Sequence, residues 1–157
     1  MSDIKTHARA VSDVIDGSIV ASVEIARAPD RVFQALASRE IIDWWVNPGV
    51  FDTKEWSGDV RIGGSWRSSG VARGQAYALE GKYLEIDPPR KLVHTWHFSG
   101  APEGASTVTY TLEPIAGGTR LTVRHSGIAA PEQRGNIGAG WRSSLERLAE
   151  TMSTRKG

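Results

Sequence analysis

The sequence contains no cysteine. This absence excludes a disulfide scaffold, a thiol nucleophile and a zinc site held by thiolates, and it favours a cytoplasmic location. The net charge is also small, because 19 Lys and Arg residues are balanced by 18 Asp and Glu residues, which gives a formal net charge of +1. A nucleic-acid-binding domain normally carries a basic excess, so we expect no nucleic-acid partner.

Long apolar runs are absent as well. None approaches the roughly 18 residues that a membrane-spanning helix requires, and the first 17 residues lack the continuous apolar segment of a secretory signal. The basic residues Arg155 and Lys156 lie beside no apolar face, so we expect no attachment to a membrane surface. The length of the chain fits one domain, which we place at residues 18–154, after an N-terminal extension (residues 1–17) that could be mobile.

Two periodicities divide the chain into strands and helices. Alternation of apolar and polar residues, typical of half-buried strands, occupies seven segments. These are residues 18–27, 50–56, 65–71, 76–86, 91–98, 106–113 and 119–126. The last six are joined by short connections, so we expect an antiparallel meander. Within residues 76–86 the apolar phase changes around Gly81, which predicts a β-bulge at that glycine.

Helical patterns flank this meander. Pro29 begins a short helix, and Ser38 is expected to be the N-cap of a second one, which carries Trp44 and Trp45 and ends at residues 47–49. A longer apolar stripe near the C-terminus recurs every three or four residues. It consists of Ile137, Trp141, Leu145, Leu148 and Met152. We expect a firm helix from about residue 140 to residue 154, because glycines weaken the segment before it.

The order of these elements predicts an α+β fold. One strand, two short helices, six strands and a long helix can form a curved seven-stranded antiparallel sheet wrapped around the C-terminal helix. The two short helices lie between the first and second strands. A ligand cavity is expected between the sheet and the long helix.

Several short stretches carry a resemblance to a known family. They are residues 28–36 (APDRVFQAL), Trp44-Trp45, residues 63–66 (GGSW), residues 81–96 (GKYLEIDPPRKLVHTW), residues 118–127 (GTRLTVRHSG) and Gly140-Trp141. Over about residues 18–153 their order and spacing resemble the AHSA-type family, the homologues of the activator of heat-shock protein 90 ATPase. This family lies within the START and birch-pollen-allergen-like (SRPBCC) superfamily, and the resemblance implies a helix-grip fold.

The resemblance does not imply one activity. Family members include chaperone-activating domains, drug-resistance proteins that sequester a toxic compound, and small bacterial proteins without assigned roles. The wider superfamily includes lipid carriers, hormone receptors and polyketide cyclases. A fold shared this widely does not name a reaction.

Aromatic residues form the candidate ligand site. Together with two histidines, they are expected on elements that surround the cavity or its mouth, although ordinary core packing is the alternative for each of them. The candidates are Trp45, Phe51, Trp66, Tyr77, Tyr83, His94, Trp96, Tyr110, His125 and Trp141. If the faces that carry them look inward, His94, Tyr110 and His125 are the polar points of the pocket.

Other motifs do not support a metal, a cofactor or a catalytic centre. His94 and His97 should point to opposite sides of a strand, so we expect no metal site. Residues 138–143 only partly match a dinucleotide-binding turn and do not follow a strand, so we expect no cofactor. A catalytic triad could be assembled from His125, Ser126 and Asp87, but no nucleophile-elbow pattern in the sequence supports it.

We therefore expect non-enzymatic binding of a small hydrophobic or aromatic molecule in an internal cavity. Two alternatives stay open. One is a co-chaperone-like domain that contacts a heat-shock protein 90-type ATPase. The other is a small enzyme of the polyketide-cyclase type, with a pocket histidine as acid or base.

Overall fold

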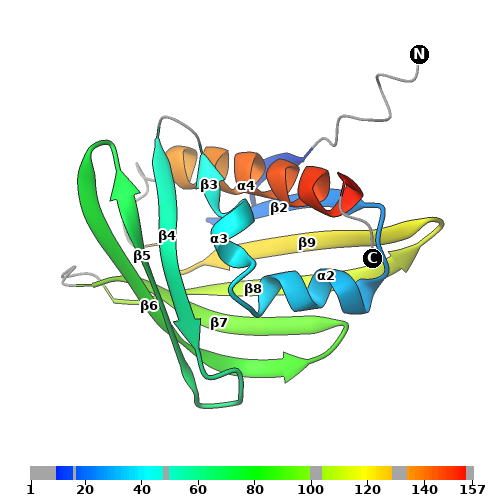
Figure 1. Ribbon diagram of the computed structural model, residues 1–157, viewed down its shortest axis with the longest axis horizontal. Coiled ribbons are helices and arrows are strands. Elements are labelled where there is room, and N and C mark those ends of the chain that lie inside the picture. The colour runs from blue at the N-terminus through cyan, green and yellow to red at the C-terminus, as the bar shows by residue number, and fades with distance from the viewer. Residues whose placement is uncertain (1–9, 16, 48–49, 100–103, 129–133, 155–157) are drawn as a thin grey trace.

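The computed structural model describes residues 10–15, 17–47, 50–99, 104–128 and 134–154. Their strands form one antiparallel sheet that curls around the C-terminal helix (Figure 1). The strands are β1 (Val11–Ile15), β2 (Ser18–Ile25), β3 (Val46–Asn47), β4 (Phe51–Gly58), β5 (Ser65–Ala72), β6 (Gln75–Asp87), β7 (Lys91–Phe98), β8 (Ser106–Ile115) and β9 (Gly118–Ser126). The helices are α2 (Pro29–Leu36), α3 (Ile41–Trp44) and α4 (Arg134–Thr154).

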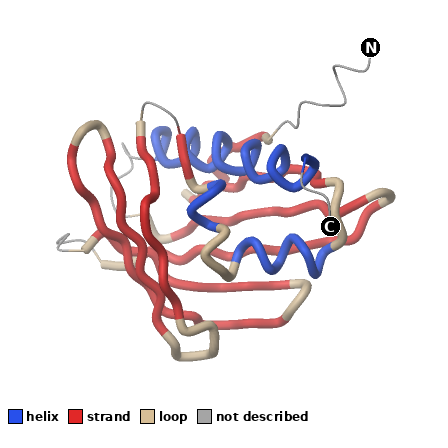
Figure 2. Tube along the Cα trace, in the orientation of Figure 1, coloured by secondary structure: helices blue, strands red, loops and turns tan. Residues whose placement is uncertain are grey.

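The predicted α+β helix-grip architecture is confirmed. The seven expected strands are β2 and β4 to β9, and the three helices lie on the concave side of the sheet (Figure 2). Two short strands that the sequence reading did not include extend the edges, so the order is β1-β2-β9-β8-β7-β6-β5-β4-β3. Strand β1 comes from the expected N-terminal extension. Residues 1–9 of that extension, the segment 48–49 and the basic residues 155–156 lie outside the described residues.

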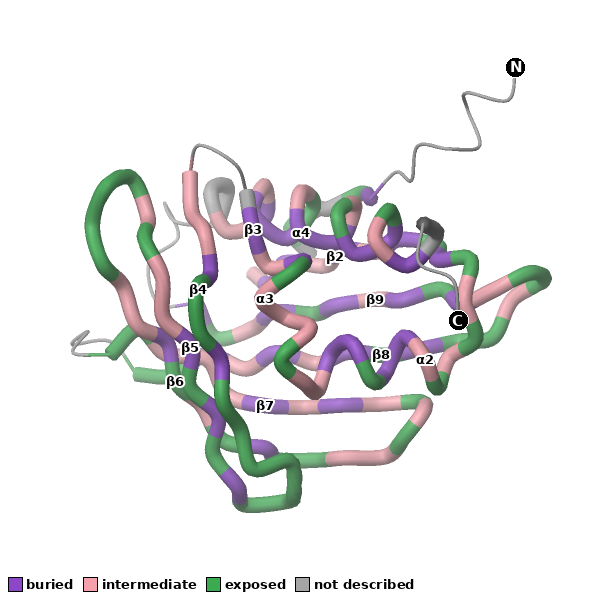
Figure 3. Tube along the Cα trace, viewed as in Figure 1, coloured by how far each residue is buried: buried purple, intermediate pink, exposed green. Residues whose placement is uncertain are grey.

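Alternation along the strands decides which side chains enter the core. On β2, Ile19, Ala21, Val23 and Ile25 are buried, and the residues between them are less buried. The same alternation runs along β7, β8 and β9 (Figure 3). The concave face of these strands is therefore the wall against which the helices pack.

The sequence predicted the β6 bulge at Gly81, but the bulge lies further along the strand. The register against β7 shifts between Tyr83 and Glu85, so Leu84 is the extra residue and points outward. Gly81 has a different role. A Cβ atom there would collide with the Thr95 carbonyl oxygen and with the Trp66 indole, so glycine allows these groups to approach the strand closely.

A second bulge changes the phase of β4. Its register against β5 shifts between Thr53 and Glu55, and as a result Thr53 and Trp56, three positions apart, are both buried. Strict alternation would have sent one of them outward. The bulge is what brings Trp56 into the core.

Helix α4 begins at Arg134, earlier than expected, because the glycine-containing segment before residue 140 is also helical. Its predicted apolar stripe is confirmed, since Trp141, Leu145, Leu148 and Met152 are each at most 2% exposed. The Arg27 side chain donates to the Met152 carbonyl at 2.7 Å, near the C-terminal end of the helix. None of the helices in the described residues combines the length and apolar character needed to cross a membrane.

The two short helices are fastened to each other and to α4. The Trp44 indole donates to the Ala35 carbonyl of α2 at 2.9 Å, and the Arg147 guanidinium donates to the Asp43 carbonyl at 2.7 Å. Helix α3 is shorter than expected, with Trp45 as its C-cap. Its N-cap is Glu40 and not Ser38, whose hydroxyl accepts from the Glu40 amide just before the helix begins.

Candidate ligand-binding site

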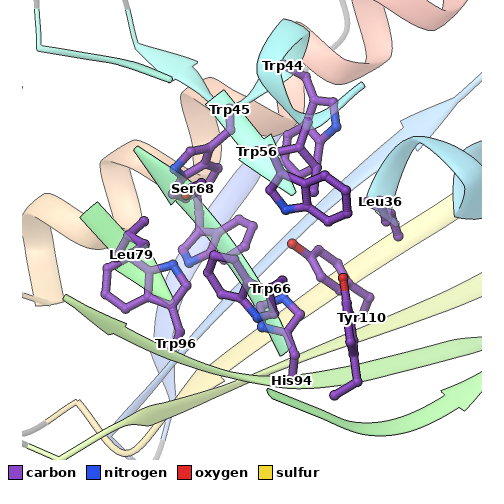
Figure 4. Close-up of a pocket in the computed structure, with 13 residues that line it drawn as sticks. Leu36, Trp44, Trp45, Trp56, Trp66, Ser68, Leu79, His94, Trp96 and Tyr110 are labelled. Atoms are coloured by element: carbon purple, nitrogen blue, oxygen red, sulfur yellow. The ribbon is translucent and has the colours of Figure 1, made fainter. Parts of the chain in front are cut away.

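Two adjoining spaces lie between the curled sheet and the helices. An inner cavity of about 30 Å³ is enclosed mainly by aromatic rings (Figure 4). An outer cleft of about 290 Å³ lies beside it, and Trp45, Leu79 and Trp96 are wall residues of both. The two spaces together form one candidate site, in which the cleft is the mouth.

Every tryptophan of the chain lines the inner cavity. The six are Trp44, Trp45, Trp56, Trp66, Trp96 and Trp141. The rings meet mostly edge to face, for example Trp45 and Trp141 with centroids 4.7 Å apart. This arrangement makes a rigid apolar wall, because aromatic side chains have few rotatable bonds and favour such contacts.

The outer cleft is apolar and opens beside the start of α4. Phe51 and Tyr77 form part of its wall from the sheet, and Gly140 lines it from the helix. A methyl group at Gly140 would lie 3.5 Å from the Phe51 ring, an ordinary contact, so glycine here enlarges the cleft without being required by sterics.

Two hydrogen bonds made by Thr53 form a latch that connects Trp45 and Tyr77 on the wall of the outer cleft. The Thr53 hydroxyl is 2.7 Å from the Trp45 carbonyl and 3.0 Å from the Tyr77 hydroxyl. Because a carbonyl can only accept, Thr53 donates to Trp45 and therefore accepts from Tyr77. Burial raises the pKa of Tyr77, so its hydroxyl stays protonated and the latch persists at neutral pH.

His94 lies at one end of the inner cavity and is 8% exposed. Its Nδ1 is 2.8 Å from the Thr95 carbonyl oxygen, which can only accept, so Nδ1 carries the proton and Nε2 carries the lone pair. Burial lowers the pKa of His94 to about 4, so the ring is neutral at pH 7.

Two tyrosines adjoin this histidine. The ring centroids of Tyr83 and Tyr110 are 6.1 Å and 5.7 Å from that of His94. Both phenols are almost fully buried, and burial raises the pKa of each well above its usual value, so both are neutral. Within the described residues, neither hydroxyl has a hydrogen-bond partner in the protein.

His125 differs, because both of its ring nitrogens are occupied. The Trp141 indole donates to Nδ1 at 3.0 Å, and Nε2 is 2.7 Å from the Ser106 hydroxyl. An indole nitrogen only donates, so Nδ1 is the acceptor and Nε2 carries the proton. Ser106 therefore accepts from His125 and donates to the Trp96 carbonyl at 3.1 Å. Burial lowers the pKa of His125 to about 3.

This direction of hydrogen bonds is wrong for a nucleophilic serine. A catalytic histidine takes the serine proton on a free Nε2 while Nδ1 donates to an acid. Here Nε2 already bears the proton and Nδ1 faces an indole donor. The triad considered from the sequence does not assemble either, because Asp87 pairs with Arg90 and the partner of His125 is Ser106, not Ser126.

The structure brings together most of the aromatic candidates. Inner-cavity walls include Trp45, Trp66, Tyr83, His94, Trp96, Tyr110 and Trp141. Trp45, Phe51, Tyr77 and Trp96 line the outer cleft. His125 lines neither space, since it lies behind Trp96 and Trp141 with ring centroids 4.9 Å and 6.0 Å away.

Sequence reasoning missed several wall residues. Trp56 enters through the β4 bulge, and Leu36 and Ile41 come from the short helices above the sheet. Leu79 could have been found, because it has the same inward phase as Tyr77 and Tyr83 on β6. Trp56 carried no signal, because strict alternation does not anticipate a bulge.

The two histidines of β7 face opposite sides of the sheet, as expected. His94 contacts the cavity rings, whereas His97 lies 3.9 Å from Glu80 on the other face. The described residues contain no group of three or more His, Asp or Glu side chains placed to hold a metal ion.

Comparison with solved structures supports the same fold. A Chromobacterium violaceum protein is 28% identical, with 90% of this chain and 100% of that chain covered and a TM-score of 0.79. A Mycobacterium smegmatis protein is 20% identical, with 94% and 98% covered and a TM-score of 0.79. DynU16, from the dynemicin biosynthetic locus, is 24% identical, with 89% of this chain and 48% of that chain covered and a TM-score of 0.71.

The family is identified by sequence. No curated protein matches the chain. Residues 26–153 match the family described as activator of Hsp90 ATPase homolog 1-like protein, which confirms the resemblance of the short motifs. Because this match covers most of the sequence, the chain belongs to the activator of Hsp90 ATPase homolog 1-like family.

Proposed function

We propose that this protein binds a small apolar or aromatic molecule between the sheet and α4 and releases it chemically unchanged. The observation that carries the proposal is the convergence of all six tryptophans on one cavity that adjoins an apolar cleft. A core needs apolar volume but does not need every tryptophan at one place. Flat aromatic walls with a few polar atoms are typical of ligand sites.

The size of the cleft limits the ligand. About 290 Å³ is at the lower end of the ~300–1,000 Å³ of typical ligand pockets, so we expect a molecule of roughly one to three rings. Enclosing ~300 Å² of apolar ligand surface contributes roughly 7 kcal/mol before the costs of association. Micromolar affinity is the expected range for such a molecule.

The hydrogen-bond directions support binding without chemistry. Ser106 and His125 form a hydrogen-bonded serine–histidine pair, and their proton lies on the wrong nitrogen for nucleophilic attack.

Tryptophan emission tests the proposal directly. A panel of fatty acids, flavonoids and aromatic polyketides is titrated into the protein at low and high salt. We expect micromolar binding that changes little with salt, because apolar burial is not screened. Trp96→Ala should weaken binding at least tenfold, whereas Leu84→Ala, a control on the outer face of β6, should leave it unchanged.

Two results would count against the proposal. The first is a panel in which no compound binds below about a millimolar, or in which binding disappears with added salt. The second is recovery of bound compounds with altered mass, which would favour the enzyme of polyketide-cyclase type.

A second candidate function comes from the family match over residues 26–153. The protein would then contact a heat-shock protein 90-type ATPase. Adding it to such an ATPase and measuring the rate of ATP hydrolysis tests this candidate. A rise in that rate without any small-molecule binding would favour the co-chaperone function.

A further inference from the structure

The inner cavity is not uniformly apolar. Besides Ser68, which lies near Trp45 in Figure 4, three polar side chains line the cavity and gather at its other end. His94, Tyr83 and Tyr110 come from the neighbouring strands β7, β6 and β8, and their rings are in contact. In Figure 4, His94 and Tyr110 lie at one end of the cavity, and Trp44 and Trp45 lie at the other. The three side chains therefore form one polar end, which we call the polar floor.

Each member of the polar floor has hydrogen-bonding capacity that the protein does not use. The Nδ1 atom of His94 is committed to Thr95, which leaves the Nε2 lone pair as an acceptor. Among the described residues, the Ser144 hydroxyl is the one side-chain polar atom that is both sealed from solvent and without a partner. The Nε2 atom of His94 and the two tyrosine hydroxyls are therefore not sealed from solvent, and the three residues that carry them line the cavity.

The polar floor is electrically neutral. Burial keeps both phenols protonated and the imidazole uncharged at pH 7, and Tyr83 and Tyr110 are close enough to influence each other electrostatically. Among the residues that the structure describes, no Lys, Arg, Asp or Glu lines the inner cavity. An ionised group placed there would lose its hydration and gain no counter-charge, which is costly.

The volume of the inner cavity sets the size of what it can accept. About 30 Å³ holds one or two small atoms, such as an oxygen and the carbon that bears it, but no ring. The cleft beyond Trp45, Leu79 and Trp96 has room for a ring system. A ligand that fills both spaces thus has an apolar body and one small polar head.

We propose that the polar floor recognises a neutral hydroxyl head group, with a phenol as the best match, and discriminates against a carboxylate on the same carbon skeleton. A phenol donates its proton to His94 Nε2 and accepts from a tyrosine hydroxyl, so both of its functions are satisfied. An ether can only accept, and a carboxylate brings a charge that the cavity does not balance. This inference rests on the proposed ligand-binding function and names the ligand class of that site.

Calorimetric titration of three compounds on one skeleton tests the inference. At pH 7 the probes are 2-naphthol, 2-methoxynaphthalene and 2-naphthoate. We expect 2-naphthol to bind at least tenfold tighter than either of the others. His94→Phe should abolish the advantage of 2-naphthol over 2-methoxynaphthalene, and Tyr110→Phe should reduce the affinity for 2-naphthol several-fold.

Tyr77→Phe is the matched control. It removes a tyrosine hydroxyl from the wall of the outer cleft, where that hydroxyl already donates to Thr53. We expect it to change the affinities for 2-naphthol and 2-methoxynaphthalene by the same factor. If it lowers the affinity for 2-naphthol alone, the hydroxyl is recognised in the outer cleft and the assignment to the polar floor is wrong.

The remaining outcomes separate the inference from the function on which it rests. Equal affinity for all three compounds overturns the inference and leaves ligand binding intact. Tightest binding of 2-naphthoate overturns it as well, because it requires a positive charge at the site. If none of the three binds while the broader panel also fails, both the inference and the proposed function fall.

Discussion

The two buried histidines differ in how many of their ring nitrogens have a hydrogen-bond partner, and this difference separates a framework residue from a pocket residue. Both point inward from neighbouring regions of the sheet, His94 from β7 and His125 from β9, and burial lowers the pKa of both. His125 has a partner on each ring nitrogen, whereas His94 has a partner on Nδ1 only. Complete hydrogen bonding makes His125 part of the framework, and the unused nitrogen of His94 makes it part of the pocket.

This contrast shows that burial and residue type do not identify a ligand-binding histidine. His125 is the more buried of the two, yet it lines neither the cavity nor the cleft. It acts on the site through Trp141 and, by way of Ser106, through Trp96. Counting donors and acceptors around each ring is therefore more informative than counting exposed area.

Acidification should have the largest effect. The folded pKa values, about 4 for His94 and about 3 for His125, lie below the ~6.5 of an unfolded chain, so the unfolded state binds protons first as the pH falls. The stabilisation is complete above about pH 6.5 and is lost below it. Between pH 7 and pH 5 we expect the free energy of unfolding to decrease by about 4 kcal/mol from the two histidines.

Urea unfolding at both pH values, followed by tryptophan emission, measures this decrease. His94→Phe and His125→Leu should each remove about half of it. If neither variant changes the decrease, carboxylates cause the acid sensitivity and the contrast between the histidines has no part in it.

Removing each histidine at pH 7 should give the next largest difference. His125→Leu leaves the buried Trp141 indole without an acceptor, and we expect a loss of about 3 kcal/mol in the free energy of unfolding. His94→Phe leaves no such orphan, because the Thr95 carbonyl still accepts from Trp66 at 3.2 Å, so a loss below about 1 kcal/mol is expected. If urea unfolding gives similar losses of free energy for His125→Leu and His94→Phe, the two histidines do not differ in their structural role.

A hydroxyl-bearing neighbour of each histidine provides a finer comparison. Ser106→Ala breaks the link between His125 and the Trp96 carbonyl and should cost about 1–2 kcal/mol. Tyr110→Phe removes a hydroxyl that has no protein partner, so its cost should be below about 0.5 kcal/mol. Chemical unfolding of both variants gives these values, and a reversed order would contradict the assignment of the polar floor.

Ser144→Ala should have the smallest effect, and in the opposite direction. The Ser144 hydroxyl on α4 is fully buried and has no hydrogen-bond partner, which is the reverse of the situation of His125. Alanine removes the unsatisfied group and is a better helix former, so we expect a gain of about 0.5–1 kcal/mol. Thermal and urea unfolding should agree in sign, and a loss of stability would mean that the hydroxyl is satisfied.

The sequence was sufficient for the fold because alternation and helical spacing are local. Ile19 to Ile25 on β2 and the stripe from Trp141 to Met152 on α4 lie where their periods place them. The phase change on β6 predicted a bulge there but placed it at Gly81 and not at Leu84, and the β4 bulge between Thr53 and Glu55 was not predicted. The position of a bulge is decided by how two strands pair, so the period of one strand alone does not fix it.

The candidate site could be predicted only to the level of faces. Alternation correctly sends His94, Tyr110 and His125 inward. It does not say that Trp141 would occupy one nitrogen of His125, because that bond joins residues whose contact depends on how α4 lies on the sheet. Trp56 shows the same limit, since its place in the cavity depends on an unpredicted bulge.

The way in which the two ends of the domain meet has a consequence for folding kinetics. The amide of Ala10 donates to Glu146, 136 positions away, and Arg27 donates to the Met152 carbonyl, 125 positions away. Contacts between such distant residues close large loops, and a high contact order slows folding. During synthesis α4 is made after the strands of the sheet, so Trp141 can reach the sheet only after the other five tryptophans have been made. The aromatic cavity therefore lacks its Trp141 wall until α4 has been made and has packed against the sheet.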